Sequence, residues 1–184
     1  MALQGPIAYQ IKQIYWIGLF GLEWEDRIWS EWGPLINNWH AGLRKPKCPT
    51  HCTIMVEDVT GVEGNGVSDE KWRETLHGRT QVWLKVKCVI VGPEGVAAQV
   101  RLDPPLYTMA CEVGGIIPHI TLKVGLGFRA RDVARMMERA SVSKWLPAKE
   151  LGKGDVEVSQ DNTLMRIRHS SRLTGEPQVV EVSE

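Results

Sequence analysis

Apolar and polar residues alternate along several short segments of the chain, and this pattern predicts strands. The alternation is clearest over residues 80–91 and 96–102. Gly92, Pro93, Glu94 and Gly95 separate these two runs, which predicts a hairpin with a short turn. Further strands are expected over residues 9–19, 51–59, 106–113 and 117–124, and short ones over 155–159, 164–168 and 179–182.

Helical spacing of apolar residues predicts three helices between these strands. The first contains Trp29, Trp32, Ile36 and Trp39 on one face, and Pro34 within it predicts a kink or two short helices. The others are expected over residues 68–77 and 130–140. Because strands and helices mix without strict βαβ alternation, the fold class is expected to be α+β with antiparallel sheets.

Length and charge narrow the classes of function. The chain has 184 residues, which suits one domain, and 22 Lys and Arg balance 22 Asp and Glu. This balance argues against binding of long nucleic acid through its backbone but leaves short nucleotides possible. The apolar run over residues 14–20 is too short to span a membrane, and it lacks the basic flank and the small-residue cleavage site of a signal peptide. We therefore expect a cytoplasmic protein without membrane contact.

The four cysteines do not suggest a metal site or a disulfide framework. Cys48, His51 and Cys52 would be candidate zinc ligands, but the paired Cys-x-x-Cys motifs of zinc sites are absent. A chain of this length does not need disulfides, so reduced cysteines are expected. No metal and no cofactor is therefore predicted.

Two His-x-Thr triplets are the strongest candidates for chemistry. They are His51-Cys52-Thr53 and His119-Ile120-Thr121. Roughly half a match to His-x-Ser/Thr is expected by chance in such a chain, and a third match occurs at His169-Ser170-Ser171. Strand alternation distinguishes them, since each of the first two triplets puts His and Thr on one face and apolar residues on the other. Around His169 the alternate positions are Arg168, Ser170 and Arg172, so no apolar face supports the third triplet.

Two imidazoles that face one cleft suit transfer of a phosphodiester. One neutral His accepts a proton from the attacking hydroxyl, and the other, protonated, donates a proton to the leaving oxygen. The hydroxyls of Thr53 and Thr121 can donate to phosphate oxygens. The alternative is that both are ordinary half-buried histidines, and the matched strand context favours the catalytic interpretation.

With these motifs the sequence resembles the 2H phosphoesterase superfamily, the LigT-like phosphodiesterases named for two His-x-Thr/Ser motifs. The resemblance covers most of residues 1–184 and implies one domain of two pseudo-symmetric lobes, with antiparallel sheets around a central cleft and helices outside. The segment from Pro118 to Leu122, and the helix that leads to Lys144-Trp145-Leu146-Pro147, resemble a viral or retroelement branch. Family likeness implies His51 and His119 as the acid–base pair and Thr53 and Thr121 as phosphate ligands.

The same likeness implies the substrate class. Members act on 2′,5′-linked nucleotides or 2′,3′-cyclic phosphates, and viral members remove 2′,5′-linked signals of innate immunity. Cyclic GMP-AMP with a mixed 2′,5′/3′,5′ linkage is the first expectation and 2′,5′-oligoadenylate the second. Cleavage of RNA 2′,3′-cyclic phosphates, a non-catalytic module that sequesters a nucleotide, and a structural segment of a polyprotein remain alternatives.

Three residues are candidate contacts to such a nucleotide. Trp83 shares a polar strand face with Lys85 and Lys87, where it is free to stack on a base. On the first strand, either Tyr15 or Trp16 faces the cleft, and Tyr15 is taken as the second platform. Lys123, two residues beyond Thr121, is expected on the same face and would attract a phosphate.

Overall fold

The computed structural model describes residues 11–21, 23–48, 50–58, 67–151 and 154–183. Its strands are β1 (Ile11–Leu19), β2 (His51–Asp58), β3 (Val82–Gly92), β4 (Gly95–Arg101), β5 (His119–Val124), β6 (Trp145–Pro147), β7 (Val156–Ser159) and β8 (Met165–Ser183). Its helices are α1 (Glu23–Trp39), α2 (Val67–Leu76), α3 (Pro104–Thr108) and α4 (Ala130–Val142), with short π and 3-10 turns at Met109–Val113 and Lys149–Leu151. The predicted α+β class with antiparallel strand pairing is confirmed.

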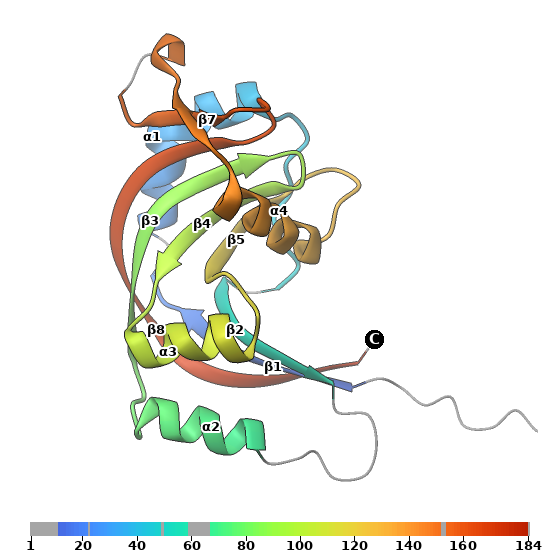
Figure 1. Ribbon diagram of the computed structural model, residues 1–184, viewed down its shortest axis with the longest axis vertical. Helices are drawn as coiled ribbons and strands as arrows, with labels where there is room; N and C mark the ends of the chain where they lie inside the picture. The colour runs from blue at the N-terminus through green and yellow to red at the C-terminus, as the bar shows by residue number, and fades with distance from the viewer. Residues whose placement is uncertain (1–10, 22, 49, 59–66, 152–153, 184) are drawn as a thin grey trace, which may run out of the picture.

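One strand, β8, joins the two ends of the sheet. The order is β1-β2-β5-β4-β3-β8-β7-β6, every pairing is antiparallel, and β1 also pairs with β8. Six strands therefore form a closed ring, and β7 and β6 extend from it. Figure 1 shows β8 bending along the length of the molecule, from β7 to β1. This closure places β2 beside β5, although α2, β3 and β4 separate them in sequence.

The larger apolar core lies on one face of this ring. It joins buried residues of all six strands with residues of α1, α2 and α3, and it includes Tyr15, Ile17, Cys52, Ile54 and Ile120, each 0% exposed. The tryptophans of α1 pack here as the helical spacing predicts, with Trp32 buried and Trp29 and Trp39 partly buried. The helix is continuous through Pro34, which is exposed, rather than divided in two.

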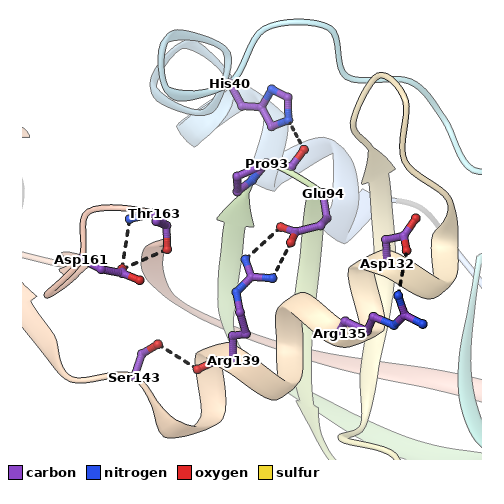
Figure 2. Close-up of polar contacts among 9 residues, drawn as sticks. All are labelled: His40, Pro93, Glu94, Asp132, Arg135, Arg139, Ser143, Asp161 and Thr163. Atoms are coloured by element: carbon purple, nitrogen blue, oxygen red, sulfur yellow. Dashed lines mark hydrogen bonds and ion pairs between the residues drawn. The ribbon is translucent and has the colours of Figure 1, made fainter.

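A second core covers part of the opposite face. It consists of Val133, Met136, Met137 and Ala140 of α4 packed on residues of β3, β4 and β5. Figure 2 shows how α4 is held there: Arg139 pairs with Glu94 in the β3–β4 turn. The same turn receives His40, whose Nε2 lies 2.7 Å from the Pro93 carbonyl oxygen. None of the helices in the described ranges is long and apolar enough to cross a membrane.

The structure corrects two strand predictions. Residues 106–113 form α3 and a π-helical turn rather than a strand, because Pro104 and Pro105 begin a helix and Asp103 Oδ1 accepts a hydrogen bond from the Leu106 amide. The expected short strands at 164–168 and 179–182 belong to one continuous strand, β8. Residues 9, 10 and 59, at the ends of two predicted strands, lie outside the described residues.

Candidate active site

The register of β2 and β5 brings the two His-x-Thr triplets together. Cys52 is paired with Ile120, and both side chains are fully buried in the larger core. In an antiparallel pair the flanking positions then lie opposite each other, so His51 faces Thr121 and Thr53 faces His119. The four side chains share the face opposite Cys52 and Ile120, on neighbouring strands about 5 Å apart. Two histidines and two hydroxyls thus form one cluster.

His119 is the more deeply placed of the two histidines, at 8% exposure. Its Nδ1 lies 2.7 Å from the Ile117 carbonyl oxygen, and a carbonyl only accepts, so Nδ1 carries the proton. In the neutral ring, Nε2 is then the nitrogen with a free lone pair. Burial lowers the pKa of His119 below its ordinary value, and the charge of His51 lowers it further. His119 is therefore suited to accept a proton at neutral pH.

His51 rests on an aromatic side chain of the neighbouring strand. The ring of Trp16 lies 4.0 Å from the His51 ring between centroids, with the planes tilted by 34°. Trp16 is itself held by a hydrogen bond of 3.0 Å from its Nε1 to Oε1 of Gln178 on β8. The Trp16 ring, held by Gln178, therefore packs against the His51 ring and limits its movement.

A groove of about 540 Å³ opens beside His51. Trp16 and Gln178 line it from β1 and β8, and Lys45 and Thr50 line it from the segment that precedes β2. Glu25 also lines it, so with Lys45 the groove carries one charge of each sign. The groove has the size of a small-molecule site, and it ends at one of the two histidines.

Two residues of β4 extend the His119 side of the cluster. Gln99 lies directly opposite His119 in the β4–β5 register. The Gln99 Oε1 accepts a hydrogen bond of 3.3 Å from the Cys88 thiol. The amide nitrogen of Gln99 is then left as a donor. Arg101, two residues further along, shares this face and is exposed. Sequence patterns did not single out either residue, because nothing in the sequence specifies which strand lies beside β5.

Tyr15 does not belong to this face, which corrects the sequence interpretation. It is 0% exposed within the larger core, where its hydroxyl donates to Asp69 Oδ1 at 2.6 Å and its ring makes an edge contact with Trp72. Trp16, the neighbouring residue, takes the position beside His51. Alternation predicts that adjacent residues face opposite ways but not which of the two faces the cleft.

Lys123 is also turned away from the histidines. The β4–β5 register shifts so that Thr121 lies opposite Ala97 but Lys123 lies opposite Val96, which leaves Leu122 as an extra residue. Its Nζ lies 5.1 Å from the centre of the Trp29 ring of α1, in a separate hollow on the side of the larger core. The bulge therefore reverses the direction that strict alternation predicts for Lys123.

Trp83 is 67% exposed, and it lies on β3 opposite Thr174 of β8. β4 separates β3 from β5, so Trp83 does not touch the histidine cluster. It is nevertheless on the same face of the ring, because Lys85, two residues on, is paired with Arg101. The predicted base-stacking role for Trp83 applies only to a ligand that extends beyond the cluster.

Cys52, which lies between His51 and Thr53, is not placed for chemistry. Cys52 faces the core, so it cannot share a metal with His51, and burial raises the pKa of its thiol to about 12. The described part of the chain contains no group of three or more His, Cys, Asp or Glu side chains that could hold a metal ion.

The third triplet lies elsewhere. Nε2 of His169 is 2.7 Å from Ser171 Oγ, and Ser171 is paired with the buried Val86, on the side of the larger core. Burial lowers the pKa of His169, and the nearby charges are those of Glu31 and Arg27 on α1. This histidine is therefore separated from the cluster by the sheet.

Comparisons with known proteins identify a fold but not a family. No protein-family model matches the chain, and no curated protein matches it. Among solved structures, a fungal RNA kinase superposes with a TM-score of 0.53 at 10% sequence identity, over 99% of this chain and 47% of the kinase chain. This chain therefore spans about half the length of that kinase. At this identity the similarity shows a shared fold.

Proposed function

We propose that this chain is a metal-independent phosphodiesterase of the 2H type that cleaves 2′,5′-linked nucleotides. The observation that carries the proposal is the pairing of Cys52 with Ile120, which sets His51, Thr53, His119 and Thr121 on one face. The fold that the chain has in common with a fungal RNA kinase supports a nucleotide-processing enzyme more generally. Mixed-linkage cyclic GMP-AMP and 2′,5′-oligoadenylate are the two candidate substrates, in the order that the sequence suggests.

In the proposed reaction the two histidines have different roles: His119 is the base and His51 is the acid. His119 Nε2 removes the proton of the free 3′-hydroxyl, whose oxygen attacks the adjacent 2′,5′-phosphorus. The O3′–P bond forms as the P–O5′ bond breaks, and His51 gives its proton to the departing 5′-oxygen. The products are a 2′,3′-cyclic phosphate and a free 5′-hydroxyl. Thr53, Thr121 and Gln99 donate to the non-bridging oxygens, where charge develops in the transition state.

The test is to incubate the protein with each nucleotide in EDTA and separate the products by chromatography. We expect cleavage by the parent and a loss of roughly 10²- to 10⁴-fold in His51→Ala and in His119→Ala, the usual contribution of a general acid or base. His169→Ala is the matched control, because His169 also has a serine two residues on but lies across the sheet. Equal rates in the parent and in both site variants would refute the mechanism.

An alternative that the same cluster supports is a module that binds the nucleotide without cleaving it. The Trp16–His51 pair and the groove beside it would then serve recognition alone. Calorimetry distinguishes the two, since tight binding with no product in the chromatographic assay assigns sequestration rather than catalysis.

A further inference from the structure

Three cations lie side by side across three neighbouring strands. Lys85 on β3 is paired with Arg101 on β4 and with Arg172 on β8, and all three side chains are exposed. Directly opposite residues point to the same face, so Arg101, Lys85 and Arg172 form one row, which we call the basic row. With about 5 Å between strands, the row places three positive charges within about 10 Å.

Among the described residues, no ion pair joins the basic row to a carboxylate. The carboxylates in these ion pairs take other partners: Asp103 pairs with Arg79, Glu94 with Arg139, Asp132 with Arg135, and Glu157 with Arg166 and Arg168. Like charges directly opposite each other destabilise a sheet. The row therefore costs stability in the free protein, and an anionic ligand would remove that cost.

The basic row continues from the candidate active site. Arg101 is two residues from Gln99, the partner of His119, and on the same face. At the middle of the row, Lys85 is two residues from the exposed Trp83, again on the same face. A path therefore runs from His119 through Arg101 and Lys85 to Arg172, with an aromatic platform beside it.

We propose that the basic row binds the backbone of a single-stranded oligonucleotide whose scissile linkage lies at the histidine cluster, with Trp83 stacking on a base. This inference rests on the proposed function and specifies its substrate class. A cyclic dinucleotide carries two phosphates in a compact ring, whereas successive phosphates of an extended chain match cations on three successive strands. The basic row therefore favours 2′,5′-oligoadenylate over cyclic GMP-AMP.

The zero net charge of the chain does not conflict with this inference. Net charge is a sum, and it conceals a face on which cations are gathered. A lipid surface would also attract such a face, but it is usually contacted through several apolar side chains, and Trp83 is the large exposed apolar residue beside the row. The continuity with His119 supports a nucleotide chain instead.

Binding is tested with a fluorescein-labelled single-stranded oligothymidylate of about eight nucleotides, a deoxy chain that the proposed reaction cannot cleave, in a salt series. Three backbone contacts predict a slope of about −2 in log K against log salt, and Lys85→Thr should reduce it by about 0.7. Lys85→Thr also removes the positive charge that repels Arg101 and Arg172, so it should raise the Tm by about 2 °C at low salt. Weaker binding together with a higher Tm is a combination that a merely structural lysine would not produce.

Cleavage is tested with a 2′,5′-linked adenylate dimer and pentamer. If the pentamer makes three phosphate contacts with the basic row at physiological salt, its kcat/KM should be on the order of fifty-fold higher than that of the dimer. The triple variant Arg101→Gln, Lys85→Gln, Arg172→Gln should lose this preference, so that its ratio of kcat/KM for the pentamer to kcat/KM for the dimer falls to about one. The matched control changes the equally exposed Lys71, Arg73 and Arg131, which lie on α2 and α4, to Gln.

The outcomes separate the two proposals. Oligothymidylate binding with the expected salt slope but no cleavage would refute the phosphodiesterase and support the basic row. Cleavage of dimer and pentamer with equal kcat/KM, or equal binding by the triple and control variants, would overturn the basic row and leave the enzyme. Binding of the parent to phosphatidylserine vesicles that is tighter than to the oligomer, and lost in the triple variant, would also overturn it.

Discussion

His51 and His119 differ in their surroundings, and the roles proposed for them rest on this difference. His119 is nearly buried and gives its Nδ1 proton to the Ile117 carbonyl, so its neutral form presents Nε2 as an acceptor. His51 is half-buried and lies against Trp16. Acid–base pairs in enzymes commonly consist of two similar groups whose environments separate their pKa values.

The lowered pKa of His119 predicts the pH dependence of cleavage. A general base works only when it is deprotonated, so activity falls at low pH as His119 takes up a proton. Because burial lowers its pKa, the acid limb of kcat/KM should have its midpoint below 6.5, the ordinary value. A pH–rate series checks this, and a midpoint at or above 6.5 would contradict the assignment.

An NMR titration of the His119 ring provides the control for that series. His51→Asn removes the charge that lowers the His119 pKa, so the midpoint should rise in this variant. It should nevertheless stay below 6.5, because burial is the larger cause. An unchanged midpoint would show that the two rings do not interact.

The directions of single side chains were only partly predictable. Alternation correctly grouped His51 with Thr53 and His119 with Thr121, because the bulges of β2 and β5 lie just beyond these triplets. It failed for Lys123, where a bulge adds one residue, and it could not choose between Tyr15 and Trp16. Both outcomes depend on the neighbouring strand, which the sequence of one strand does not specify.

At the scale of elements, the passage of β8 from β3 to β1 closes the ring, and Gly175 lies at that point. It is paired with Val82 on one side and with Leu19 on the other. A Cβ on Gly175 would lie 2.3 Å from Ile17 Cγ2 and 2.7 Å from the Gly18 carbonyl oxygen, closer than atoms can approach. Only glycine allows β1 and β8 to pair this tightly here.

We expect Gly175→Ala to lower the free energy of unfolding by about 1–3 kcal/mol, the usual cost of overpacking a core. Urea denaturation followed by tryptophan fluorescence measures the change. Gly154→Ala is the control, since no atom lies within 4 Å of its Cβ position, and it should change stability by less than about 0.5 kcal/mol. Equal stability of the two variants would show that this crossing does not limit ring closure.

Strand and helix predictions succeeded where a local pattern determines the element. Alternation of apolar and polar residues predicts the hairpin of β3 and β4, and helical spacing predicts α4. In both cases the pattern also matches the face that packs on the core. The prediction of a strand after Asp103 is wrong because the apolar residues of this segment suit either structure. The two prolines and the Asp103 cap favour a helix. The length of β8 depends on its two partner strands, which its own sequence does not reveal.

At the scale of the whole molecule, one continuous ring of strands produces both the histidine cluster and the basic row. It brings β2 beside β5, which unites two triplets distant in sequence, and it aligns β4, β3 and β8, which gathers cations on one face. Neither feature is visible in composition, since the chain is neutral and its histidines are few. The fold therefore places the two triplets and the cations, each a weak signal in the sequence, on one surface.

The central claim is that His51 and His119 act together on one phosphate. The most direct test is single-turnover cleavage of a 2′,5′-linked adenylate by His51→Asn, His119→Asn, the double variant and the His169→Asn control. Residues that act as a unit are strongly non-additive. Each single variant should lose at least about 10²-fold, the double variant should lose no more than the worse single one, and the control should match the parent. Independent, multiplicative losses, or a site variant as active as the control, would contradict the account.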